Sequence, residues 1–183
     1  MLDVVVTAVV VSGFVLLGVA AARHVRWHDD FVAQLRAQRL WPSGSEARVA
    51  WAVTGAEAVV GALGVLLLAF GVGAASLTPL LGGLVVLGVG FVGLQVFLLV
   101  ARPEAPCGCD PAHDTRVGVG TLAKAAWPAV AGVVGLVALP AEALDALPLV
   151  AALVAVFAGL ALAWAVDATP AWIDRGTGGQ PAS

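Results

Sequence analysis

Long hydrophobic segments alternate with short polar ones along most of the chain. Apolar stretches occupy residues 4–22, 49–70, 77–100 and 117–139, and a fifth follows at 148–166. Each is close to the about 20 residues that a helix needs to cross the hydrocarbon core of a bilayer. A helix also satisfies its own backbone polar groups, as lipid requires. The pattern therefore predicts an all-α, polytopic membrane protein.

Residues 27–40 follow a different pattern. Trp27, Phe31 and Leu35 recur every four residues, and polar residues fall between them. This spacing is typical of an amphipathic helix that lies on the membrane surface rather than crossing it. We expect the segment Pro42-Ser43-Gly44 to end this interfacial helix.

The pattern divides the chain into three parts. Residues 1–140 are expected to form a four-helix transmembrane bundle, with a polar loop at 101–117 between its third and fourth spans. Residues 141–166 hold the fifth span. Residues 167–183, rich in Gly, Pro, Thr and Ser, are expected to be a disordered tail.

Composition supports a membrane location and excludes one class of partner. The chain is 61% hydrophobic and 11% charged, which is too apolar for a water-soluble domain of 183 residues. Its net charge of −3, with basic residues confined to loops, argues against a nucleic-acid partner. The lipid bilayer is the expected environment.

The basic residues indicate an orientation. The loop between the first two spans carries Arg23, Arg26, Arg36, Arg39 and Arg48, and the 101–117 loop carries Arg102 and Arg116. The loops on the opposite side have no Lys or Arg. The positive-inside rule therefore predicts a multi-pass protein of the cell membrane with its amino terminus outside and the 101–117 loop in the cytoplasm.

Both cysteines of the chain lie in that loop, as Cys107-Gly108-Cys109. Glycine between them permits backbone angles that other residues resist, so the pair can close a small disulfide ring. A strained, exposed disulfide is a labile and oxidising one. The pair is therefore a candidate thiol–disulfide exchange site of an oxidoreductase. The alternative is a pair of unreactive loop thiols.

A metal site is a second interpretation of the same loop. Cys107, Cys109 and His113 form C-x-C-x3-H, and His24 and His28 could approach from the same membrane face. Sulfur and imidazole ligands suit zinc or copper. On this alternative the chain is a non-enzymatic metal-binding or accessory subunit of a larger complex. By themselves, the two earlier histidines are typical of interfacial hydrogen-bonding residues.

Three polar residues lie inside the predicted spans. Glu57 is in the second span, Gln95 in the third and Lys124 in the fourth. Ionisable groups are costly in the membrane and usually face a partner or a cavity. A Glu57/Lys124 ion pair that fixes the helix register is the simplest interpretation. The alternative is a polar pocket, shared with Gln95, that handles protons or binds a quinone beneath the cysteines.

Several segments together resemble the MauE family of membrane proteins, which is grouped with DoxX-like and quinone-linked thiol oxidoreductase bundles. They are AARHVRWHDDFVAQLRAQRLWP, the second span AVTGAEAVVGALGVLLL, and PCGC before VGVGTLAKAAW. The resemblance covers residues 10–140. Its CGC motif falls on residues 107–109, its second-span acid on Glu57, and its fourth-span basic residue, more often arginine, on Lys124.

The chain departs from the family pattern after the second cysteine, where Asp110-Pro111 replaces the usual Phe-Gly. The resemblance implies electron supply or disulfide formation for exported proteins, with a thioredoxin-like or disulfide-containing partner, as in maturation of the methylamine dehydrogenase small subunit. That substrate is not carried over to this chain. Exported substrates would place the cysteines outside, whereas the arginines place them inside, and we follow the arginines.

Overall fold

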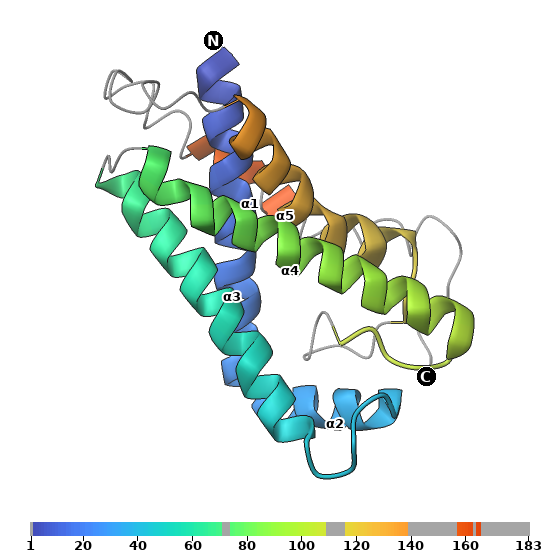
Figure 1. Ribbon diagram of the computed structural model, residues 1–183. Coiled ribbons are helices and arrows are strands. Elements are labelled where there is room, and N and C mark those ends of the chain that lie inside the picture. The colour runs from blue at the N-terminus through green and yellow to red at the C-terminus, as the bar shows by residue number, and fades with distance from the viewer. Residues whose placement is uncertain (1, 71–73, 109–115, 139–156, 163, 166–183) are drawn as a thin grey trace.

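The computed structural model describes residues 2–70, 74–108, 116–138, 157–162 and 164–165. Within them the chain folds into α1 (Leu2–Arg26), α2 (His28–Gln38), α3 (Glu46–Ala69), α4 (Ala74–Ala101) and α5 (Val119–Ala138). Four of these helices, all but α2, are long and apolar enough to cross a membrane. The predicted all-α membrane fold is confirmed (Figure 1).

The predicted fifth span lies largely outside the described residues, although 157–162 and 164–165 are helical. The predicted tail at 167–183 lies wholly outside them. The division into three parts therefore stays a prediction.

Helix α1 is the centre of the bundle. Its apolar window is 61% buried, against 22% for α3 and for α4. Phe14 and Leu17 of α1 pack in one cluster with Leu81 and Leu84 of α4 and Ala131 of α5. Burying α1 among the other helices leaves their outer faces apolar and exposed, as helices in contact with lipid must be.

Small residues set how closely the helices approach. A Cβ added to Gly61 of α3 would lie 2.6 Å from the backbone nitrogen of Gly18 in α1. One added to Gly132 of α5 would lie 2.7 Å from the carbonyl oxygen of Leu81 in α4. Such close backbone contact is how helices associate in lipid, where burying apolar surface gives no driving force.

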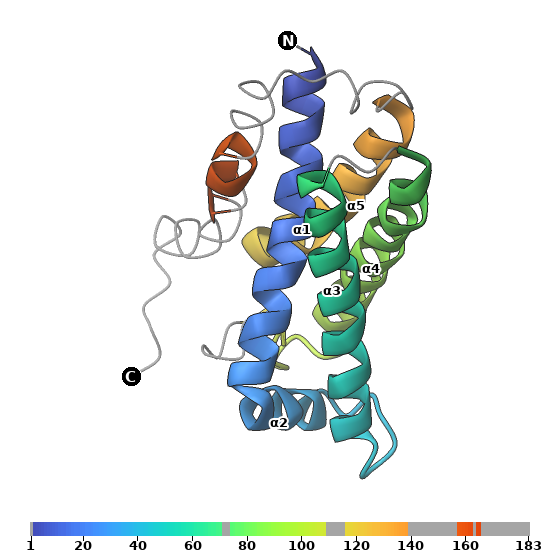
Figure 2. The same ribbon diagram turned by 90° about the vertical axis from the view of Figure 1, so that its left-hand side faces the viewer.

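Helix α2 lies across one end of the bundle, at a steep angle to α1 and α3 (Figure 2). Its Phe31 and Leu35 pack against Ala50 of α3. The helix ends at Gln38, earlier than expected, because Arg39 adopts a left-handed conformation with φ of 51° and its N–H bonds to Arg36 O. The turn begins before Pro42-Ser43-Gly44 is reached.

The end of the bundle that carries α2 also carries the cysteine loop. Helix α4 ends at Ala101, and residues 102–108 turn back toward α2 (Figures 1 and 2). The basic residues of both loops therefore gather at this end of the molecule. The membrane location is supported by the four spanning helices, and the side on which this end lies stays a prediction.

Candidate functional site

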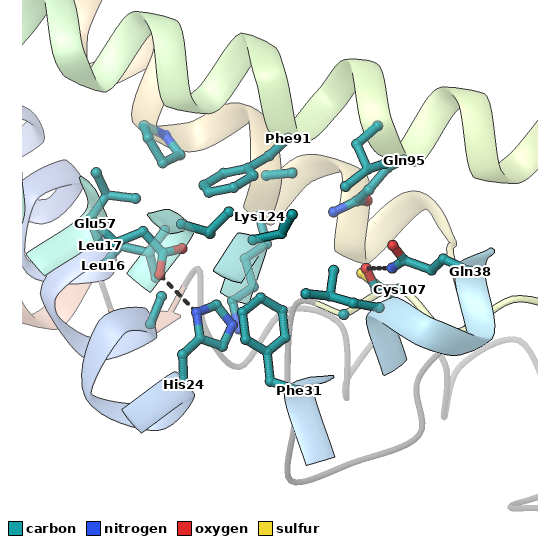
Figure 3. Close-up of a pocket in the computed structure, with 18 of the residues that line it drawn as sticks. Leu16, Leu17, His24, Phe31, Gln38, Glu57, Phe91, Gln95, Cys107 and Lys124 are labelled. Carbon is teal, nitrogen blue, oxygen red and sulfur yellow. Dashed lines mark hydrogen bonds and ion pairs between the residues drawn. The ribbon is translucent and has the colours of Figure 1, made fainter. Parts of the chain in front are cut away.

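A cavity of about 90 Å³ lies inside this end of the bundle, beneath the cysteine loop (Figure 3). Helices α1 to α5 all contribute to its wall, and most of the lining side chains are apolar. The polar and charged members are His24, Gln38, Glu57, Gln95 and Lys124, with Cys107 at one side. The volume is several times the roughly 10–15 Å³ that one water molecule needs, so the cavity has room for several water molecules or for part of a small ligand.

Short-range contacts fold the loop back over this cavity. The N–H of Ala105 donates to Arg102 O at 2.9 Å, which makes a tight turn after α4. Pro106 and Arg116 then form an isolated antiparallel bridge across the loop. The Arg116–Glu104 ion pair, 3.0 Å long, is largely exposed on both sides and adds little. The bridge and turn together bring Cys107 above the bundle.

Gln38 of α2 holds the loop in this position. Its amide Nε2 donates to Pro106 O at 3.2 Å and to Cys107 O at 3.4 Å, and the residue is fully buried. Gly108 next to it has φ of +74°. A Cβ there would lie 3.0 Å from Gln38 Nε2 and 3.8 Å from the Phe31 ring. Glycine is therefore needed both for the backbone angle and for the space beneath α2.

Cys107 is disulfide-bonded and only 3% exposed. The sequence holds one other cysteine, Cys109, which lies outside the described residues. The expectation of an exposed loop sulfur is wrong for Cys107, because Phe31 and Gln38 of α2 cover this part of the loop. Its side of the disulfide faces the interior of the bundle.

Glu57 meets a histidine. Its Oε2 lies 2.7 Å from His24 Nδ1, and the two residues are 2% and 4% exposed. The His24 ring stacks on Phe31 with 3.9 Å between centroids and 6° between planes. Lys124, the partner expected from the sequence, lines the same cavity from α5, and Gln95 lines it from α4. The polar residues of three predicted spans thus converge, and His24 joins them.

The lining of the cavity by His24 and Gln38 was not predicted from the sequence, although both fall at buried positions of their helices. Phe14, Leu17 and Ala21 are buried residues of α1 at steps of three and four, and His24 is the next member of that series. Gln38 continues the buried series of α2 in the same way. A polar residue at a core position of such a stripe faces the interior.

Among the buried polar atoms of the cavity residues, His24 Nε2 and Gln38 Oε1 have no hydrogen-bond partner within the described part of the chain. Buried polar atoms are normally paired, and those that are not point to a water or a ligand. The cavity thus offers one ring nitrogen and one amide oxygen to a small occupant.

The metal alternative gains no support from the described residues, which contain no group of three His, Cys, Asp or Glu side chains able to hold an ion. His28 stacks on Trp51 at 4.3 Å between centroids. Cys109 and His113 lie outside the described residues, so the C-x-C-x3-H ligand set stays a prediction.

These features define a class: a helical membrane protein with a disulfide-bonded cysteine held over a cavity that contains buried polar residues. Comparison with protein families is more specific. The chain belongs to the MauE family, described as methylamine utilisation protein MauE, whose model matches residues 1–137. No curated protein and no solved structure matches the chain.

Proposed function

We propose that this protein is a membrane thiol–disulfide oxidoreductase in which Cys107 and Cys109 form the exchanging pair. The observation that carries the proposal is Cys107 itself, disulfide-bonded and fixed by Gln38 over a cavity with buried polar groups. A structural disulfide would not need such a cavity beside it. Oxidation of the two thiols forms one S–S bond and releases two protons and two electrons.

Burial supports a division of labour between the two cysteines. Cys107 is 3% exposed, so a thiol of a partner protein cannot reach its sulfur from outside. We assign contact with a thioredoxin-like or disulfide-containing partner to Cys109. Cys107, which lines the cavity, is the residue that would pass electrons to a molecule bound there.

A quinone headgroup matches the chemistry of the cavity. The walls are largely apolar, the space has room for part of a small ligand, and His24 Nε2 is a buried polar atom that needs a partner. Phe31 and Phe91 would bound the ring, with Gln95 and Lys124 as further polar neighbours. A bound quinone would supply the acceptor for the two electrons and two protons of the thiol pair. The isoprenoid tail would extend into the surrounding lipid.

The test uses the full chain in lipid vesicles, with dithiothreitol as electron donor and decylubiquinone as acceptor. Wild-type protein should reduce one quinone for each dithiol oxidised. Cys107→Ser and Cys109→Ser should each abolish this turnover, because neither remaining thiol can form the intramolecular disulfide. Quinone reduction that continues in the double serine variant would overturn the proposal, and so would wild-type thiols that the quinone fails to oxidise.

The division of labour has its own readout. In Cys107→Ser, the Cys109 thiol should form a mixed disulfide with glutathione disulfide in intact vesicles. In Cys109→Ser, the buried Cys107 thiol should react much more slowly, because it is exposed only when the loop lifts. Equal modification of the two variants would contradict the assignment.

A further inference from the structure

We propose that His24 is the residue that exchanges a proton with the molecule in the cavity, and that Glu57 is the positioning residue that orients it. This inference deepens the proposed function and rests on it. It concerns a pair that joins α1 to α3.

The pairing fixes which ring nitrogen does the exchange. An ionised Glu57 carboxylate can only accept, and opposite it His24 Nδ1 carries the hydrogen and donates it across 2.7 Å. Nε2 then accepts a proton when the ring is neutral and donates one when the ring is charged. A base oriented by a carboxylate, with its second nitrogen facing the reacting molecule, is a recurrent catalytic arrangement.

Packing holds the imidazole in one orientation. The ring lies almost parallel to Phe31 and is 4% exposed, so neither rotation nor solvent competes for it. The distance between α1 and α3 is fixed nearby, where Gly61, one turn beyond Glu57, allows close contact with Gly18. The geometry of the pair is therefore a property of the helix packing.

The second ring nitrogen of His24, Nε2, is left for a molecule in the cavity to bond. It has no hydrogen-bond partner among the described residues, and His24 lines the cavity that Cys107 also lines. Figure 3 places His24 and Cys107 on different sides of this space, with the Glu57 contact on the far side of the imidazole. A molecule in the cavity can therefore touch both residues, although the structure records no contact between them.

The overall reaction requires protons to move, and His24 Nε2 is placed to transfer them. Two thiols and one quinone become one disulfide and one hydroquinone, so two S–H bonds break and two O–H bonds form. Charged His24 gives its Nε2 proton to a quinone oxygen and is left neutral with its Nδ1–H still on Glu57. A proton released by the thiols reloads it. His24 touches the reacting atoms and is therefore a catalytic residue.

The titratable groups that face this cavity come from several elements. They are His24 of α1, Glu57 of α3 and Lys124 of α5, and disulfide-bonded Cys107 lines the cavity beside them. His28 does not line the cavity and stacks instead on Trp51. His28→Asn is therefore the matched control for loss of a histidine at this end of the bundle.

The first experiment needs no turnover. In the Cys107→Ser/Cys109→Ser protein, the infrared carbonyl band of bound decylubiquinone reports the hydrogen bond to its oxygen. We expect this band to shift with pH, because a group that exchanges a proton with the oxygen changes the hydrogen bond that it makes. His24→Gln, which keeps an amide beside Glu57 but has no proton to exchange, should remove the pH dependence. His28→Asn, at a residue that does not line the cavity, should keep it.

The second experiment uses the protein with both cysteines. His24→Gln should lower kcat for quinone reduction by about 100-fold or more, the usual value of general acid–base catalysis, with KM little changed. Glu57→Gln keeps an acceptor at Nδ1 but removes the charge that stabilises the imidazolium, so its kcat should fall by a smaller factor. Exchange of the disulfide with dithiothreitol, which does not involve the quinone, should stay at the wild-type rate in both variants.

The outcomes separate the two proposals. Inactive cysteine variants combined with wild-type kcat and an unchanged infrared pH dependence in His24→Gln would overturn the role of His24 and leave the thiol chemistry standing. No quinone reduction by wild-type protein would instead overturn the proposed function. If His24→Gln fails to reach the membrane folded, Glu57→Gln decides: wild-type kcat in that variant contradicts the proposal.

Discussion

Gly108→Ala perturbs the loop at the residue between the two cysteines. The backbone angle of +74° is one that residues with a Cβ adopt at a cost of about 1–2 kcal/mol. The new methyl group would also lie 3.0 Å from Gln38 Nε2 and would press on the amide that holds Cys107 O. A penalty of one to two kcal/mol changes an equilibrium by roughly 5–30-fold.

The assay is the rate at which Cys107 reacts with a maleimide in the Cys109→Ser background, where it is the one remaining thiol. Because Cys107 is buried, it reacts only when the loop lifts, so the rate follows the opening equilibrium. Gly108→Ala should raise the rate by roughly 5–30-fold, as the change in that equilibrium requires.

A double-mutant cycle divides this effect between backbone and contact. Gln38→Ala alone removes two long hydrogen bonds and should raise the labelling rate, at about 0.5–1.5 kcal/mol for each bond lost. In the Gln38→Ala background, Gly108→Ala should cost less than it does alone, because the close contact is gone. If the labelling rate of Cys107 stays within twofold of the Cys109→Ser parent in every variant, Gln38 does not hold the cysteine loop in place.

Three further predictions concern the bundle and its orientation. Gly61→Ala should destabilise the protein by about 1–3 kcal/mol in thermal unfolding, because its Cβ meets the α1 backbone, whereas Gly55→Ala, with no heavy atom of the described residues within 4 Å, should not. Trp127→Phe loses the 2.9 Å bond from Nε1 to Ser12 Oγ and should cost about 0.6 kcal/mol in thermal unfolding. A single cysteine introduced into the 101–117 loop of the Cys107→Ser/Cys109→Ser protein should react with a membrane-impermeant thiol reagent only from the cytoplasmic side, and labelling from outside would reverse the orientation.

Hydrophobic patterning was enough to predict the four spanning helices and the short, non-spanning α2. Apolar runs of bilayer length can be satisfied only by spanning helices, so the order of these four helices follows from the sequence, and the fifth span stays a prediction. The structure extends α1 to Arg26, one turn beyond the apolar run, because a helix continues through polar residues where nothing interrupts its backbone bonds. The end of α2 was misplaced since a left-handed arginine leaves no signature in composition.

The cavity could be predicted only in part. Depth in the membrane marks Glu57, Gln95 and Lys124 as residues that need partners, and all three line one space. The partner of Glu57 was not predicted because pairing between helices depends on their relative rotation, which the weakly amphipathic spans do not encode. Cys107 was placed on the surface because a polar loop usually is, but Gln38 draws this one inward.

Helix α2 contacts both the His24 side and the Cys107 side of the cavity. Its Phe31 lies flat against the His24 imidazole, and its Gln38, two turns further on, grips the backbone of the cysteine loop. Movement of α2 away from the bundle would expose Cys107 and remove the stacking contact on the His24 imidazole at the same time. A displacement of α2 at the water–lipid boundary would therefore act on His24 and on Cys107 at once.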